Sequence, residues 1–160
     1  MIEKLIGEIL RRNNLTISCA ESCTGGLLTS RLTDVAGSSD YVKGSIISYT
    51  DEIKNKILKV QSETLKNFSA VSEETAFEMA KNVREIFQTN IGIGITGYAG
   101  PGGDEVGKVF ISLAHEKNVE VKKFLFKGSR IEIKNQAVDA ALRFLKNFLL
   151  FTEAEKNFEK

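Results

Sequence analysis

The sequence has 160 residues, a length that one compact domain with a single hydrophobic core accommodates. Its 22 basic and 21 acidic side chains give a formal net charge of +1, which offers no broad field to a polyanion, so we exclude nucleic acid as a partner. The apolar stretches are short and interrupted by charges, and no signal-peptide pattern is present, which favours a cytoplasmic protein that does not enter a membrane.

Cysteine and histidine are too scarce to suggest a metal centre. Cys19 and Cys23 are four positions apart, which is neither a redox-pair spacing nor half of a zinc site, so we expect reduced thiols. His115 is the only histidine, and a Ser-His-Asp triad would have to use it. We therefore expect no metal ligands and look elsewhere for a catalytic base.

Hydrophobic periodicity predicts helices and strands that alternate along the chain. In chain order we expect a helix over 2–12, a strand over 15–20, a helix from 27 to 35, a strand within 41–49, a short helix from 51 to 58, a helix over 72–88, strands over 91–96, 107–114 and 119–126, and a helix from 129 onward. Asp51 and Ser72 are the expected N-caps, and Ser129 with Glu132 forms a capping box.

This order of elements predicts an α/β fold. We expect a three-layer α/β/α sandwich around a mixed, mainly parallel five-stranded sheet, with the last two strands antiparallel because a short turn at 116–118 joins them. One domain is expected over 1–152, followed by a polar, frayed tail at 153–160.

Three loops that follow strands carry most of the candidate functional residues, at 21–26, 49–54 and 97–103. In open α/β sheets such loops converge at the carboxyl ends of the strands. The first loop places Ser22 and Thr24 at a helix N-terminus, where free N–H groups favour an oxyanion or a phosphate. The same residues are equally typical of a helix cap followed by glycines that permit close packing.

Lys54 is the candidate base. Near the N-terminus of its helix the dipole disfavours an ammonium group and lowers the pKa, and a partly neutral lysine can take a proton from a serine hydroxyl. The alternative is a solvated surface lysine beside Lys56 and Lys59. The sequence spacing does not show whether Ser22 and Lys54 meet.

The glycine-rich loop at 97–103 offers backbone N–H groups to a phosphate, or it is a structural turn. It matches neither the Walker P-loop nor the dinucleotide-binding pattern. Arg130, at the start of the last helix, is placed either to pair with a phosphate or to sit in solvent.

Five segments, taken together, are far more specific than any one of them. They are Ala20-Glu-Ser-Cys-Thr-Gly-Gly26, Arg31-Leu-Thr-Asp34 with Gly37-Ser-Ser39, Ser48-Tyr-Thr-Asp-Glu-Ile-Lys54, Ala70-Val-Ser-Glu73 and Thr96-Gly-Tyr-Ala-Gly-Pro-Gly-Gly103. In this order they closely resemble the CinA C-terminal domain family, over nearly the whole chain. The resemblance implies an α/β/α fold, the stand-alone form of this domain and, as in the active members, hydrolysis of nicotinamide mononucleotide to nicotinate mononucleotide and ammonia without a cofactor.

The resemblance also implies roles for individual residues. It makes Ser22 the nucleophile and Lys54 its partner, and Tyr49 either orients the lysine or stacks on the pyridine ring. The N–H groups of Cys23 to Gly25 would stabilise the oxyanion. The residues expected to bind the nucleotide substrate are Cys23, Thr24, Gly25, Gly26, Thr96, Gly97, Gly100, Gly102 and Arg130.

Three positions depart from the family pattern. The family has a longer insertion with Glu-Lys-Pro after the glycine loop, whereas here Gly103 is followed at once by Asp-Glu-Val-Gly107. Asp51 replaces an asparagine and adds negative charge beside Lys54, while Lys134 replaces an arginine and so exchanges a forked donor for a point charge.

Three other interpretations remain open. Cys23, also at a helix N-terminus, is an alternative nucleophile. The domain is otherwise a non-catalytic module that binds a pyridine nucleotide or regulates, because a fold is shared more widely than an activity. Apolar residues near the C-terminus also suggest a homo-oligomer contact; these are Phe144, Phe148, Leu149, Leu150 and Phe151.

Overall fold

The computed structural model describes all 160 residues. It contains five strands, six α-helices and one short 3-10 helix. In chain order these are α1 (Ile2–Arg12), β1 (Ile17–Glu21), α2 (Leu27–Thr33), η1 (Ser38–Asp40), β2 (Val42–Ile47), α3 (Asp51–Lys56), α4 (Ser62–Phe68), α5 (Glu73–Phe87), β3 (Ile91–Gly97), β4 (Lys108–His115), β5 (Asn118–Leu125) and α6 (Arg130–Phe158).

The sheet has the strand order β2-β1-β3-β4-β5. β1 pairs in parallel with β2 and with β3, whereas β4 pairs antiparallel with both of its neighbours. Four of the five strands therefore point the same way, which confirms the predicted mixed, mainly parallel sheet. The helical connections after β1 and β2 permit the parallel pairs. The short turn between β4 and β5 requires these two strands to pair antiparallel.

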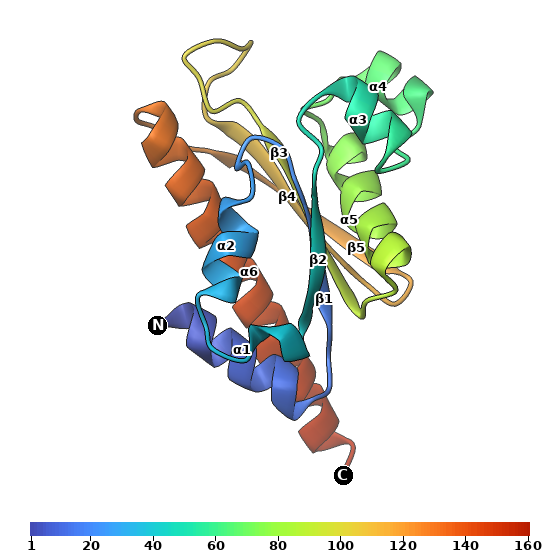
Figure 1. Cartoon of the computed structure of the whole chain (residues 1–160), viewed down its shortest axis with the longest axis vertical. Helices are drawn as coiled ribbons and strands as arrows, with labels where there is room; N and C mark the ends of the chain where they lie inside the picture. Colours follow the sequence, from blue (N-terminus) through green and yellow to red (C-terminus); the bar gives the residue numbers. More distant parts are fainter.

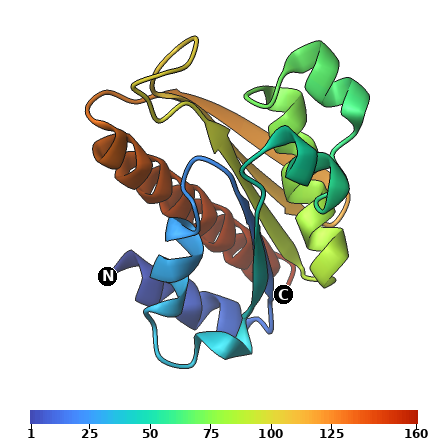
Figure 2. The same ribbon diagram turned by 45° about the horizontal axis from the view of Figure 1, so that its top comes forward.

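Helices cover both faces of this sheet, which confirms the three-layer arrangement. Helices α1, α2 and α6 lie on one face, and α5 lies on the other with α3 and α4 beside its upper end (Figure 1). The larger core cluster lies between the sheet and the first group of helices, and a smaller cluster lies between the sheet and α5. Figure 2 shows that the loop at 98–107 projects beyond the upper edge of the sheet.

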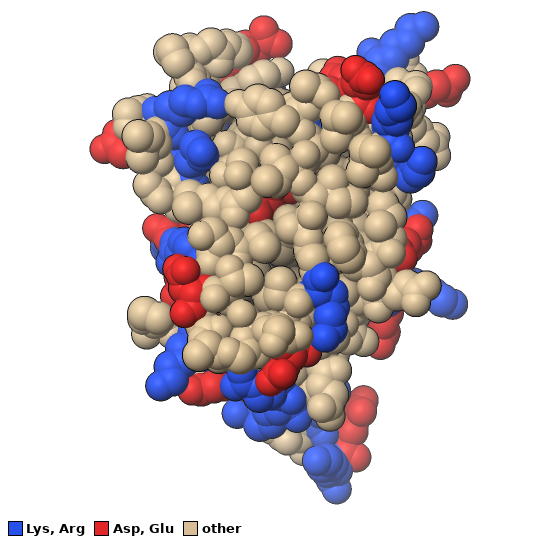
Figure 3. All heavy atoms as spheres, viewed as in Figure 1, with Lys and Arg blue, Asp and Glu red and all other residues tan.

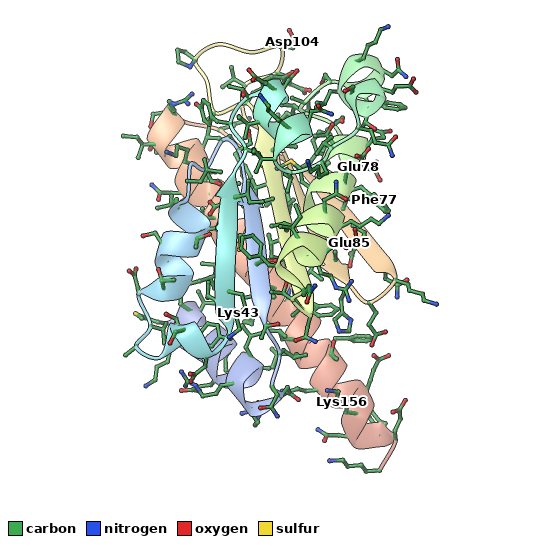
Figure 4. All side chains as sticks on the ribbon, turned by 45° about the vertical axis from the view of Figure 1, so that its right-hand side comes forward. Lys43, Phe77, Glu78, Glu85, Asp104 and Lys156 are labelled. Atoms are coloured by element: carbon green, nitrogen blue, oxygen red, sulfur yellow. The ribbon has the colours of Figure 1, made fainter.

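The surface carries both signs of charge. On the face shown in Figure 3, basic and acidic side chains mix around the edge, and neither sign covers a broad area. Figure 4 places Phe77 and Glu85 on the side of α5 that lies next to β5, and Asp104 near the tip of the projecting loop. None of the helices has both the length and the apolar character that crossing a membrane requires.

Two local predictions differ from the structure. Helix α4 was not predicted, because a single turn or two with few apolar residues gives no clear periodicity. Asp51 was the expected N-cap of α3, but Thr50 caps it, with its Oγ1 accepting a hydrogen bond from the N–H of Ile53 at 3.3 Å. Threonine and aspartate are both good caps, so sequence alone does not choose between adjacent ones. The predicted caps at Ser72 and Ser129 are confirmed.

The prediction of a frayed tail at 153–160 is wrong, because α6 continues to Phe158. Glu153 accepts hydrogen bonds from both Nη2 and Nε of Arg12, at 2.8 Å and 3.0 Å, and one from Nδ2 of Asn13 at 2.6 Å. This contact with the end of α1 holds the last turns of α6 against the domain.

Only part of the apolar C-terminal group is exposed. Phe144 and Leu149 are buried in the core, and Phe148 packs edge-on against His115 with ring centroids 5.1 Å apart. Leu150 and Phe151 are 43% and 65% exposed. Of the apolar residues expected at a homo-oligomer contact, these two are exposed enough to take part. The contact itself stays a prediction.

Candidate active site

The alternation of side chains along β1 decides what each residue of the first loop faces. Ser18 and Ala20 point to α5, where they contact its backbone and its apolar side chains. Cys19 and Glu21 point to the opposite face, toward α2 and α6. Ser22, the next residue, continues the pairing with β3 through its N–H and returns to the α3 and α5 side.

A tight turn follows Ser22. The N–H of Gly25 donates to the carbonyl of Ser22 at 3.0 Å, and α2 begins two residues later. Gly25 and Gly26 have φ angles of 61° and 101°, which other residues adopt only with strain. The pair of glycines is therefore required by the turn itself.

Lys54 lies on α3, and its side chain is only 1% exposed. Its Nζ donates hydrogen bonds to Oγ of Ser22 at 2.8 Å and to the carbonyl of Ser48 at 2.7 Å. No carboxylate forms an ion pair with it. The structure thus brings the two predicted residues into direct contact, and Lys54 is buried rather than solvated.

The environment of Lys54 favours the neutral amine. Burial lowers the pKa of Lys54, and the negative charge of Asp51 only partly opposes this effect. The helix dipole is not the main cause that the sequence position suggests, because with Thr50 as cap the N–H of Lys54 already donates to the Thr50 carbonyl at 2.9 Å. Removal from water is the main cause.

The pair lies in a pocket of about 190 Å³ where the carboxyl ends of β1, β2 and β3 meet. Nine of the predicted site residues line it: Ser22, Cys23, Tyr49, Lys54, Thr96, Gly97, Gly100, Gly102 and Arg130. The lining residues that the sequence analysis did not single out are Ala70, Val71, Tyr98 and Ala99. Since all four lie in segments that carry the family resemblance, the motifs themselves were the available signal.

Thr24, Gly25 and Gly26 do not line the pocket. The hydroxyl of Thr24 turns away and donates to Oε1 of Glu21 at 2.7 Å. The expectation that Gly25 offers its N–H to an oxyanion is wrong, because Ser22 already accepts that hydrogen bond. The N–H groups of Cys23 and Thr24 have no acceptor within the chain, and of these two residues Cys23 lines the pocket.

Arg130 and Tyr49 form the rim of the pocket. Arg130 donates from Nη2 to the hydroxyl of Tyr49 at 2.7 Å and from Nη1 to the carbonyl of Gly100 at 2.6 Å. Both acceptors are neutral, so the positive charge of the guanidinium is not compensated by a carboxylate. Thr96 donates its hydroxyl to the carbonyl of Ala70 at 2.7 Å, which fixes the wall opposite the rim.

Cys23 is a poor nucleophile in this setting. Burial raises the pKa of Cys23 to about 11, so the thiolate form is scarce near neutral pH. No group of three or more His, Cys, Asp or Glu side chains is arranged to hold a metal ion. A larger groove of about 480 Å³ lies between α4 and α5, but neither a serine nor a cysteine lines it.

The fold and the pocket define an α/β protein with a buried serine-lysine pair at the carboxyl ends of its parallel strands. A family model described as the CinA C-terminal domain matches residues 1–149, so the chain belongs to the CinA C-terminal domain family.

Individual relatives agree with this assignment. A CinA-like protein of Flavobacterium psychrophilum is 44% identical over 163 residues, which cover 99% of this chain and 38% of that protein. A CinA-like protein of Kosmotoga olearia is 45% identical over 153 residues, which cover 93% of this chain and 37% of that protein. The chain therefore spans less than two fifths of the length of these relatives.

Solved structures show the same fold. The crystal structure of a competence-damaged protein (CinA) superfamily protein from Enterobacter cloacae superposes with a TM-score of 0.90 at 35% identity, covering 92% of this chain and 90% of that chain. A competence/damage inducible protein from Agrobacterium tumefaciens gives a TM-score of 0.85 at 37% identity, covering 90% and 93% of the two chains.

Proposed function

We propose that this domain is an amidohydrolase that converts nicotinamide mononucleotide and water to nicotinate mononucleotide and ammonia. The observation that carries the proposal is the 2.8 Å contact between Nζ of Lys54 and Oγ of Ser22 inside a pocket. A serine hydroxyl needs an adjacent base to become a nucleophile, and a buried amine without a carboxylate partner meets that need. The choice of substrate rests on the family resemblance.

The reaction begins when Oγ of Ser22 attacks the carboxamide carbon and the neutral amine of Lys54 takes the hydroxyl proton. The new C–O bond forms a tetrahedral intermediate whose oxygen carries the displaced electron pair. The C–N bond then breaks, and Lys54 returns its proton to the leaving nitrogen, which departs as ammonia. Water hydrolyses the resulting ester by the same two steps and releases the carboxylate.

The free N–H groups of Cys23 and Thr24 are the donors nearest in sequence to the attacking oxygen. Both belong to the turn that carries Ser22, so they are held in place before the substrate arrives. Fixed donors of this kind stabilise the charge that develops on the carbonyl oxygen, which is commonly the largest single contribution to such catalysis.

The dimensions of the pocket suit one end of a nucleotide. Its volume of about 190 Å³ is below the roughly 300–1,000 Å³ of sites that enclose a whole drug-sized ligand. The pyridine carboxamide therefore enters, and the ribose phosphate stays at the rim, where Arg130 offers an uncompensated forked donor. Tyr49, 56% exposed, lies beside it.

The test is ammonia release from nicotinamide mononucleotide by the wild type, Ser22→Ala, Lys54→Ala and Lys56→Ala. Removing the base is expected to reduce kcat by roughly 10²- to 10⁴-fold. Lys56 is on the same helix, but its side chain is 71% exposed, so Lys56→Ala controls for a general loss of positive charge.

Two outcomes would contradict the proposal. If the wild type binds the nucleotide but releases no ammonia, the domain is the non-catalytic module instead. If Cys23→Ala abolishes turnover while Ser22→Ala does not, the thiol is the nucleophile, because the alanine keeps the backbone N–H of residue 23.

A further inference from the structure

Glu21 is a fully buried carboxylate that forms no ion pair. Four donors surround it instead. Oε1 accepts from the Thr24 hydroxyl at 2.7 Å and the Leu28 N–H at 2.9 Å, and Oε2 accepts from the Thr29 hydroxyl at 2.7 Å and the Thr29 N–H at 3.0 Å. A charge without an opposite charge is costly to bury, so these bonds are the reason it is tolerated.

Glu21 lies directly before Ser22 but on the opposite face of the sheet. It does not line the pocket, and the mechanism above gives it no proton to move. Its carboxylate binds one residue of the turn, Thr24, and two N–H groups in the first turn of α2. The turn is therefore held from behind, by a group that the substrate does not touch.

This arrangement has two effects on the donors of the turn. The N–H groups of Leu28 and Thr29 are occupied by the carboxylate, so they are not available to an anion in the pocket. The Thr24 hydroxyl is fixed at 2.7 Å, and this contact restrains the backbone that carries the free N–H groups of Cys23 and Thr24. The direction of these two donors thus depends on a contact across the strand.

We propose that Glu21 is a positioning residue that, through Thr24, aligns the backbone donors of Cys23 and Thr24 with the oxygen that becomes negatively charged in the transition state. This inference rests on the proposed function. Because the alignment matters when charge develops and not when substrate binds, its loss lowers kcat and leaves KM unchanged.

The matched pair of variants is Thr24→Val and Thr29→Val. Each removes one hydroxyl that donates to Glu21 at 2.7 Å and keeps the size of the side chain and the backbone N–H. Only Thr24 belongs to the turn that carries Ser22. We expect Thr24→Val to reduce kcat about tenfold with KM within twofold of the wild type, and Thr29→Val to leave both within twofold.

A purely structural role of Glu21 predicts a different result. The two variants would then lose similar stability in urea unfolding and have the same kcat, and that outcome would overturn the proposal. Glu21→Gln removes the charge and presents an amide NH₂ to one of the donors, so it is expected to lower kcat at least as much as Thr24→Val. If Glu21→Gln fails to fold, the comparison of kcat between Thr24→Val and Thr29→Val still tests the proposal.

A second measurement separates this inference from the proposed function. An alkyl fluorophosphonate forms an O–P bond to an activated serine and loses fluoride, and in the transition state its phosphoryl oxygen gains negative charge where the oxyanion of amide hydrolysis forms, whatever the natural substrate is. If the wild type releases no ammonia but Ser22 is labelled, the amidase proposal fails, while slower labelling of Thr24→Val than of Thr29→Val still supports the role of Glu21. Equal labelling rates would refute it.

Discussion

Because the amine of Lys54 is buried, we predict a pH dependence of the free energy of unfolding that does not depend on the identity of the substrate. Because burial lowers the pKa of Lys54 in the folded state, the unfolded chain keeps this proton up to about pH 10.4 while the folded chain releases it at a lower pH. Between those two values the unfolded state holds more protons. Lowering the pH through this window therefore destabilises the fold, and below the folded-state pKa the loss stops growing.

Lys54→Met removes the titrating group and keeps a long side chain. The substitution leaves the carbonyl of Ser48 without the donor that it has in the wild type, which costs about 1–3 kcal/mol at every pH. In addition to this constant cost, the difference in unfolding free energy between the variant and the wild type should change with pH. For each unit by which the pH is lowered within the window, it should shift in favour of the variant by up to about 1.4 kcal/mol, because the wild type is destabilised and the variant is not. The sign is fixed by the direction of the pKa shift.

Urea unfolding of the wild type and Lys54→Met at pH 7, 8, 9 and 10 measures this difference directly. Lys56→Met is the control, because Lys56 is exposed and makes only a 3.7 Å contact with Glu52, also exposed. Its difference from the wild type should not vary with pH. A constant difference for Lys54→Met over the same range would show that the amine is not destabilised by burial, and the case for a neutral base would fail.

Two further substitutions test the surroundings of the pair, and a third tests the contact that holds the end of α6. Asp51→Asn removes a charge that raises the pKa of Lys54, so the acid side of the kcat/KM profile should move to lower pH. Arg130→Met should raise KM for nicotinamide mononucleotide about 10- to 100-fold, but not for the riboside, which has no phosphate. Glu153→Gln should cost about 0.5–1 kcal/mol in urea unfolding at pH 7. Because Arg12 lowers the pKa of Glu153, that cost should vanish as the pH falls below about 4.

Local signals in the sequence predicted two of the three helix caps, Ser72 and Ser129, and missed the third by one residue. The capping box of Ser129 and Glu132 spans three residues, and the structure contains it. The contact between Ser22 and Lys54 spans 32 residues and depends on the register that places Glu21 beside Ile47 in the parallel pair of β1 and β2. Hydrophobic alternation does not determine such a register, so only the family resemblance linked the two residues.

Other features had no local signal at all. The last turns of α6 are held by the contact of Glu153 with Arg12, 141 residues away, and a polar composition alone therefore suggested a frayed end. Glu21 was quoted only as part of a motif, because nothing in the sequence shows that a carboxylate is buried or which side of a strand it occupies. Its four donors lie within eight residues, yet they meet it only once the turn has formed.

The placement of Glu21 and Lys54 on opposite sides of the sheet has a chemical consequence. Both side chains are buried and neither has an oppositely charged partner. An ion pair between them would offset part of the cost of removing each charged group from water. Such a pair would also raise the pKa of Lys54 and keep it as an ammonium group, which cannot accept a proton. Because adjacent residues of a strand point to opposite faces, Glu21 can fix the turn from one side while Ser22 meets an uncompensated amine on the other. An amine without a carboxylate partner can act as the base that the proposed function requires.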